Sequence, residues 1–306
     1  MKKYYILIFL WLAGFNYSYT QASNLTDNKP LSSDVVVNNS NSNSIVKLNF
    51  LDHVENATGV TFGSQIITAL IADHILSKKI KGHVKLRLKF YSLSQFFKYK
   101  IKAVNLTLTN ASIKGVKFKS VKFISTKPLL GKLVDKQNLV FDEPLQGYFT
   151  VKINQADLAQ TLNNAKVLDR LKAFSLKLPD FGSVKLSLIN PKVKFSNDKI
   201  IIAAKLVGSD GNVDNGADIN ISGKLALDSP SFIVLKELQV TSPDITDSTD
   251  FSSTISDLIN PVVNLYRLRK NGYAIELRDI ITENNEILVK GKAGIKLKAI
   301  KLPKHI

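Results

Sequence analysis

The stretch KGHVKLRLKF, residues 81–90, decides how this chain folds. Polar and basic side chains alternate in it with apolar ones. The first set is Lys81, His83, Lys85, Arg87 and Lys89, and the second is Val84, Leu86, Leu88 and Phe90. Because successive side chains of a strand point to opposite faces of a sheet, this alternation predicts a long strand with one buried face and one solvated face.

A helical pattern precedes this strand, between Thr61 and Ile80. Ser64 is placed to cap its start, and Lys78 and Lys79 suit the negative end of the helix dipole. Apolar residues cover nearly every side of the predicted helix, which indicates that it is enclosed rather than laid on a surface. Its apolar stripe includes Ile66, Ile67, Leu70 and Ile71.

The next two predicted strands, 99–109 and 113–125, change the phase of their alternation midway. Lys98, Lys100 and Lys102 are followed by Val104, Leu106 and Leu108, which requires a bulge or kink near Ala103. The second strand changes phase around Ser120. Bulges in consecutive strands predict a strongly coiled sheet.

The rest of the chain is again dominated by strand patterns. Predicted strands cover 145–153, 181–195, 199–207, 217–227, 232–241, 273–282 and 287–297, with hairpin turns at 196–198 and 283–285. Helical patterns cover 154–170 and 251–268, the second with a kink or break at Pro261. The sequence therefore predicts an α+β fold in which a coiled antiparallel β-sheet is wrapped around a long apolar helix.

The N-terminus has the pattern of a targeting segment. Lys2 and Lys3 precede an apolar run, Tyr4–Phe15, and a small-residue cleavage site ends at Ala22. This predicts a signal peptide at residues 1–22 and a secreted or periplasmic protein, with an uncleaved signal anchor as the alternative. The Asn- and Ser-rich residues 23–46 are predicted to be a disordered polar tail, and 47–306 a single domain.

Composition narrows the range of functions. The 306 residues are 44% hydrophobic, which rules out wholesale disorder, and they include no cysteine, which rules out disulfides, thiolate zinc sites and thiol catalysis. The formal net charge is +17, which implies an anionic partner.

The positive charge is concentrated in one region. Residues 74–134 contain 15 Lys or Arg and no Asp or Glu, whereas residues 208–257 contain nine acidic residues and two lysines. The basic half is either a solvated face that keeps the protein soluble or a docking face for an anionic membrane surface. Nucleic acid is the poorer choice, because no nucleic-acid-binding motif is present.

Motifs of catalysis are missing. There is no nucleophile elbow, P-loop or dinucleotide fingerprint, and the four histidines are scattered. Asp210, Asp214 and Asp218 lack the ligand spacing of a calcium loop. We therefore expect no cofactor, no metal and no catalytic residue.

Three further segments resemble a known family in their order and spacing. They are AVNLTLTNASIKGVKF (103–118), PLQGYFTVKINQADLAQTLN (144–163), and LINPVVNL (258–265) followed by the GYAIEL strand (272–277). Together with the helix that precedes residue 81, they make residues 62–297 similar to the LmeA-like phospholipid-binding proteins. The resemblance implies a fold of the tubular lipid-binding superfamily, with a hydrophobic groove between sheet and helix that takes acyl chains.

This resemblance leads to a set of expected site residues. Acyl chains are expected against Ile66, Ile67, Leu70, Ile71, Leu86, Leu88, Leu106 and Leu108. The headgroup and an anionic membrane surface are expected at Lys81, Lys85, Arg87, Lys98 and Lys100. Sequence alone does not distinguish these apolar residues from an ordinary dry core.

The favoured hypothesis is thus a non-catalytic phospholipid-binding protein that carries or presents lipid in the cell envelope. The alternative is a basic interaction module that binds an acidic glycan or protein, and a lipid hydrolase is a third candidate.

Overall fold

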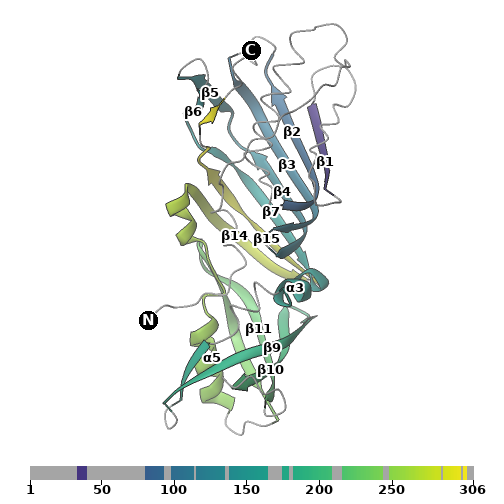
Figure 1. Ribbon diagram of the computed structural model, residues 1–306, viewed down its shortest axis with the longest axis vertical. Coiled ribbons are helices and arrows are strands. Elements are labelled where there is room, and N and C mark those ends of the chain that lie inside the picture. The colour runs from purple at the N-terminus through teal and green to yellow at the C-terminus, as the bar shows by residue number, and fades with distance from the viewer. Residues whose placement is uncertain are drawn as a thin grey trace.

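The structure is a computed structural model that describes residues 33–39, 80–92, 98–113, 115–134, 138–164, 174–178, 182–208, 216–243, 248–283, 285–297 and 299–301. Within these ranges the chain forms two antiparallel sheets, which follow one another along the long axis of the molecule (Figure 1).

The large sheet has ten strands. They are β1 (Ser33–Asn39), β2 (Ile80–Phe90), β3 (Lys100–Ile113), β4 (Val116–Ser125), β5 (Leu129–Leu133), β6 (Asn138–Phe141), β7 (Leu145–Asn154), β14 (Tyr273–Glu283), β15 (Glu286–Ile295) and β16 (Ile300–Lys301). Their order is β14-β15-β7-β4-β3-β5-β6-β16, and β2 pairs with β3 and with β1.

The small sheet has six strands in the order β13-β12-β11-β10-β9-β8. They are β8 (Phe174–Leu178), β9 (Gly182–Ser196), β10 (Lys199–Gly208), β11 (Ala217–Ser229), β12 (Phe232–Thr241) and β13 (Val263–Asn264). The helical elements are α3 (Gln155–Leu162), α5 (Ser248–Ile259) and the 3₁₀ helix η1 (Tyr266–Asn271).

Helix α3 joins the two sheets. On one side the Thr161 hydroxyl accepts a hydrogen bond from the Lys117 amide in β4 at 2.9 Å. On the other side Gln155 Oε1 accepts one from the Phe195 amide in β9, also at 2.9 Å. The buried side chains of both sheets belong to one continuous hydrophobic cluster, so the sheets share a core.

The predicted fold class is wrong. The described residues are mostly strand, and their α-helices are short, with 8 residues in α3 and 12 in α5. A sheet wrapped around a long apolar helix is therefore not the architecture, because none of the described helices is long enough to line a sheet of this size. Of the segment on which the long helix was predicted, residues 61–80, only Ile80 is described, and it begins strand β2.

Part of the predicted polar tail forms a strand. Residues 33–39 are β1, which pairs antiparallel with β2 from Ser33 opposite Leu88 to Asn39 opposite Gly82. The run Val35-Val36-Val37 explains the difference, because β-branched residues favour extended backbone even inside a polar segment.

The bulge expected near Ala103 is confirmed. Lys89 pairs with Ala103 but its neighbour Phe90 pairs with Ile101, so β3 contains one extra residue at this point. A second shift lies where Gly82 adopts a φ of +120° against Asn110 and Ala111. A side chain at Gly82 would meet the Asn110 carbonyl oxygen at 2.6 Å, so glycine is required there.

The turn and helix-break predictions also hold. Residues 197–198 connect β9 to β10, with Asn197 at positive φ, and Asn285, also at positive φ, directly precedes β15 after the end of β14. Helix α5 ends at Ile259, just before Pro261, and η1 begins only at Tyr266. The apolar pattern over 251–268 therefore covers the end of α5, the short strand β13 and the start of η1.

Candidate functional site

The apolar site residues predicted on strands lie together on one face of the large sheet, which we call the inner face. Leu86 pairs with Leu106, and Leu108 lies opposite Val84 in the neighbouring register position. Leu86, Leu88 and Leu108 are at most 1% exposed, and Leu106 is partly buried against the same cluster. These side chains are in contact with other protein atoms, so a lipid would reach them only by displacing protein. The helix residues of the prediction, Ile66, Ile67, Leu70 and Ile71, lie outside the described residues.

Two of the predicted headgroup residues lie on the opposite face, the outer face. Lys85 and Arg87 alternate with Leu86 and Leu88 along β2, so the sheet itself separates the two sets. A lipid whose acyl chains lay against Leu86 would therefore not place its headgroup on Lys85. The sequence prediction assigned both sets to one ligand. Alternation shows which residues share a face of the sheet, but it does not show which of them lie at an end of the sheet, where a headgroup could be bound.

The remaining basic predictions lie on β2 and near one end of the large sheet. Lys81 is exposed on β2, Lys98 is exposed just before β3, and Lys100 is half-buried at the start of β3. Lys100 pairs with Leu130 of β5, and the end of the sheet that holds β5 points away from the small sheet (Figure 1). The structure thus brings Lys98 and Lys100 together with a strand that was not in the predicted site.

This end exposes an unusual number of apolar side chains. Four of the seven large hydrophobic residues that are exposed within the described ranges lie here: Tyr91 at 50%, Leu130 at 45%, Leu133 at 42% and Val134 at 66%. Exposed apolar side chains that cluster at one end of a molecule indicate an interaction surface. We call these four residues, with Lys98, Lys100, Lys102 and Lys132, the β5 end.

The lysines of the β5 end differ in their partners. Lys132 forms an ion pair with Asp142, and the nearby Lys127 lies 3.9 Å from Glu143. Lys102 lies over the ring of Tyr91, with Nζ 5.7 Å from the ring centroid. Within the described residues, Lys98, Lys100 and Lys102 have no carboxylate at ion-pair distance. Their charge is therefore available to an anionic partner.

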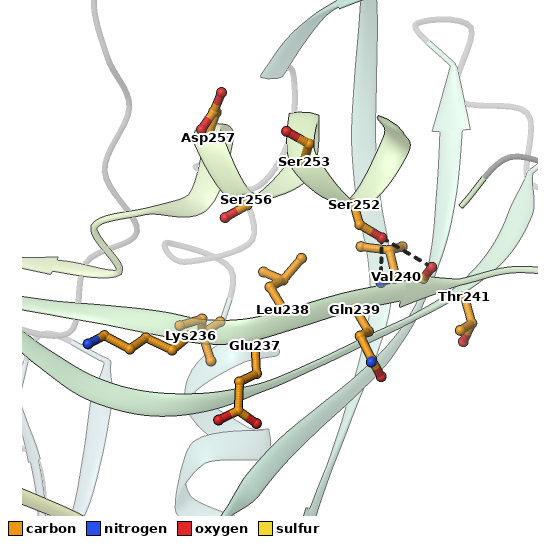
Figure 2. A pocket seen from close by; sticks show the side chains of 11 residues that line it. Lys236, Glu237, Leu238, Gln239, Val240, Thr241, Ser252, Ser253, Ser256 and Asp257 are labelled. Carbon is orange, nitrogen blue, oxygen red and sulfur yellow. Dashed lines mark hydrogen bonds between the residues drawn. The ribbon is translucent and has the colours of Figure 1, made fainter. Parts of the chain in front are cut away.

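A groove of about 980 Å³ lies in the small sheet, between α5 and β12 (Figure 2). Its lining residues are Leu235, Lys236, Glu237, Leu238, Gln239, Val240, Thr241, Ser252, Ser253, Ser256 and Asp257. Figure 2 shows Leu238 and Val240 on the side of β12 that faces α5, whereas Glu237 and Gln239 point away from the helix.

The polar side chains in and beside this groove have a structural role. Asn260 binds both backbone groups of Leu235, accepting from the amide at 2.8 Å and donating to the carbonyl at 3.0 Å. The Ser252 hydroxyl accepts from the Val240 amide at 3.0 Å. Ser252, Ser256 and Asn260 follow each other at intervals of four, so one stripe continuing from α5 covers the free edge of β12. Sequence reasoning missed this stripe, although its four-residue spacing was visible.

Among the described residues, no group of three or more His, Asp or Glu side chains is placed to hold a metal ion. Of the candidate calcium ligands, Asp210 and Asp214 lie outside the described residues. No helix in the described part of the chain is both long and apolar enough to cross a membrane.

Comparison of the chain with protein-family models, with curated proteins and with solved structures gave no match. The resemblance to the LmeA-like proteins therefore stays a prediction, and the function is argued from the site alone.

Proposed function

We propose that this chain is a non-catalytic phospholipid-binding protein of the cell envelope, which docks on an anionic membrane surface through the β5 end. The observation that carries the proposal is the presence, at one end of the large sheet, of four exposed apolar side chains beside Lys98, Lys100 and Lys102, which have no carboxylate partner among the described residues. Carrying or presenting lipid, and secretion through residues 1–22, belong to the same proposal.

The cations account for attraction to the surface. Each lysine near an anionic bilayer contributes about 1 kcal/mol, and this contribution falls off within a Debye length. Lys98, Lys100 and Lys102 together would contribute about 3 kcal/mol, which corresponds to roughly a hundredfold in membrane affinity. An attraction of this kind requires anionic lipid and weakens in salt.

The apolar residues account for retention at the surface. Leu130 and Val134 lie four positions apart, on and just after the short strand β5, so alternation places them on one side, where they can enter the headgroup region together. Leu133 falls on the other side of the strand. Tyr91 suits the same depth, because an aromatic ring with a polar tip favours the membrane–water boundary. Burial of apolar area is insensitive to salt, so it leaves a residual affinity when the charges are screened.

The test is co-sedimentation of the full chain with two kinds of vesicle, one of phosphatidylcholine alone and one that also contains phosphatidylglycerol. We expect binding to the second kind to be about a hundredfold tighter than to the first. Replacing Lys98, Lys100 and Lys102 by Gln should lower the partition coefficient about a hundredfold. Replacing Leu130 and Val134 by Ser should mainly remove the binding that persists at high salt.

The matched control changes the same number of charges elsewhere. Lys192, Lys194 and Lys236 are exposed on the small sheet, and their replacement by Gln gives the same net charge as the β5-end variant. This control should bind nearly as well as the unmodified chain. Equal losses in the two triple variants would show that net charge, and not the β5 end, determines binding, and would overturn the proposal.

Lipid carriage is tested separately by native mass spectrometry and lipid extraction. A stoichiometric phospholipid that is released on denaturation would support carriage. A clean apo mass, with no uptake from anionic vesicles, would restrict the function to surface docking. Salt-sensitive binding to an acidic glycan, without any binding to vesicles, would favour the interaction module instead.

A further inference from the structure

A second cationic site lies on the outer face of the large sheet, centred on Tyr148 of β7. Tyr148 is 45% exposed, and two cations lie close to its ring. Arg278 Cζ is 5.0 Å from the ring centroid and Lys292 Nζ is 5.7 Å from it. Ile124, which is 56% exposed, pairs with Tyr148 from the other neighbouring strand. We call Ile124, Tyr148, Arg278 and Lys292 the Tyr148 patch.

The sheet places these residues by register and by a bulge. Lys292 of β15 lies directly opposite Tyr148 in the β7–β15 pairing. Arg278 is the extra residue at a register shift in β14, where Leu277 pairs with Gly291 but Asp279 pairs with Lys290. Bulges of this kind re-aim a side chain, and here the result is a guanidinium group above the ring of a strand two positions away.

Packing on the inner face of the sheet holds the strands of the Tyr148 patch together. The Phe149 ring lies across Gly291, so close that a side chain at Gly291 would meet the ring at 2.6 Å. Phe149 itself is 8% exposed and belongs to the core. The strands that carry Tyr148, Arg278 and Lys292 are therefore held together by packing on the opposite face.

The two cations have no acidic partner among the described residues. Lys290, in the neighbouring register row, differs in this respect, because it pairs with Asp279 at 3.6 Å. Glu276 lies opposite Lys292 across the β14–β15 pairing without forming an ion pair. The Tyr148 ring thus has two positive groups, on the adjacent strands β14 and β15, at 5.0 and 5.7 Å from its centroid, and their N–H donors are available for a ligand.

We propose that the Tyr148 patch binds the phosphate group of an anionic ligand. A guanidinium fork next to an ammonium group matches the several acceptor oxygens of a phosphate, and a guanidinium held on an aromatic ring loses less freedom on binding. The exposed Ile124 on the far side of the ring suits a ligand with an apolar part beside its phosphate. This site stands on different residues from the β5 end and does not depend on the proposed function.

The experiment is a methyl NMR titration of the full chain labelled at isoleucine, in which Ile124 reports on the patch. Sodium phosphate should shift the Ile124 methyl resonance saturably, and sodium chloride at the same ionic strength should not. Dihexanoyl phosphatidylglycerol, used below its micelle concentration, is the second probe. Tighter binding of this lipid than of inorganic phosphate assigns the site to a lipid headgroup, and equal binding assigns it to a soluble phosphate compound.

Substitutions test which residues are responsible for phosphate binding. Arg278→Gln should weaken phosphate binding at least about tenfold, because a charge-assisted hydrogen bond is lost. Lys192→Gln, at an exposed position of the small sheet, should change it less than about twofold. Tyr148→Leu should weaken binding about threefold and Tyr148→Phe should restore it, because the ring positions the cations.

The proposal is overturned if phosphate and chloride shift Ile124 alike, or if Lys192→Gln and Arg278→Gln weaken binding equally. The other isoleucine resonances check that each variant keeps its fold. Because inorganic phosphate is the first probe, the outcome is independent of vesicle binding at the β5 end.

Discussion

The two sheets are built by the same alternation of apolar and polar residues, but they carry opposite charge. Residues 80–154, which form most of the large sheet, contain 15 basic and 3 acidic residues. Residues 174–264, which form the small sheet and α5, contain 8 basic and 11 acidic residues. Both inner faces contribute to one core, so the difference lies only in what the outer positions hold.

The comparison shows that the core sets the fold and leaves the surface free for function. In the small sheet, exposed charges are used within the molecule, as in the ion pairs of Lys224 with Asp198 and of Lys199 with Glu237. In the large sheet, Lys100 and Arg278 have no such partner among the described residues. Both sheets pair some of their charges, since Lys119, Lys132 and Lys290 of the large sheet also have carboxylate partners. The difference is that the large sheet carries a surplus of cations, which it presents to a ligand.

The largest expected effect tests whether the shared core makes the two sheets one folding unit. Leu86 in the large sheet is 0% exposed and Ile219 in the small sheet is 1% exposed. Replacing either one by Ala should cost about 2–5 kcal/mol of unfolding free energy, through lost burial and a cavity. Urea unfolding followed by circular dichroism should show one transition that both variants shift.

The comparison breaks down if each variant shifts a separate transition, because the sheets would then be independent units. Lys192→Ala, at an exposed position of β9, is the control and should leave the midpoint within about 0.5 kcal/mol of the unmodified chain.

The second effect concerns alkaline pH and the large sheet. Burial raises the pKa of Tyr273 in β14 from 10.0 to about 12, because the charged phenolate is poorly solvated there. A raised pKa means that the stabilisation is fully present below the unfolded value and is lost as the pH rises. Between pH 10 and pH 12 the unfolding free energy should fall by about 2–3 kcal/mol.

Tyr273→Phe removes the titrating group and serves as the control. Urea midpoints measured at several pH values should decline over this window in the unmodified chain and decline less in the variant. Parallel curves for the two proteins would show that Tyr273 does not titrate in this way.

The third effect concerns the polar stripe of the small sheet. Asn260→Ala removes both hydrogen bonds to the backbone of Leu235, an edge position that water does not fully reach. The unfolding free energy should fall by about 1–3 kcal/mol, and the Leu235 amide should exchange faster with deuterium. Ser253→Ala, an exposed position on α5, should do neither. Unchanged exchange at Leu235 in the Asn260 variant would refute the capping role of the stripe.

Local features of the fold could be predicted from the sequence because each depends on neighbouring residues. The alternation over 81–90, the bulge near Ala103 and the turns at 196–198 and 283–285 were all visible in residue order. The global architecture was not predictable in this way. A helix enclosed by a sheet and two sheets that share a core require the same apolar residues, and only their long-range pairing distinguishes the two.

For the same reason, the charged residues of the candidate site could be predicted from the sequence, but their neighbours in space could not. The charge of Lys98 and Lys100 was evident, but their neighbour Leu130 comes from a segment that showed no regular pattern. Arg278 and Lys292 gave no signal either, because they reach Tyr148 only through the register of three strands and one bulge. Contacts made by pairing distant segments are invisible in a single sequence.

The smallest expected effect tests the charge contrast between the sheets directly. On the small sheet, the side-chain hydrogen bond from Lys224 lowers the pKa of Asp198, and the same bond raises the pKa of Lys224. The stabilisation linked to Asp198 is present above its unfolded pKa, near 3.8, and is lost as the pH falls through the lower folded value. The stabilisation linked to Lys224 is present below its unfolded pKa of 10.5 and is lost as the pH rises through its raised folded pKa.

Lys224→Gln should therefore raise the pKa of Asp198 toward 3.8 in a carboxyl NMR titration, with little change in stability because both groups are exposed. Lys199→Gln, which removes a weaker Coulombic influence, should raise it less. An unchanged pKa of Asp198 in the Lys224 variant would mean that Asp198 and Lys224 do not interact in solution. Lys224 would then be as unpaired as Lys100 of the large sheet, and the contrast between the two sheets would not hold at this position.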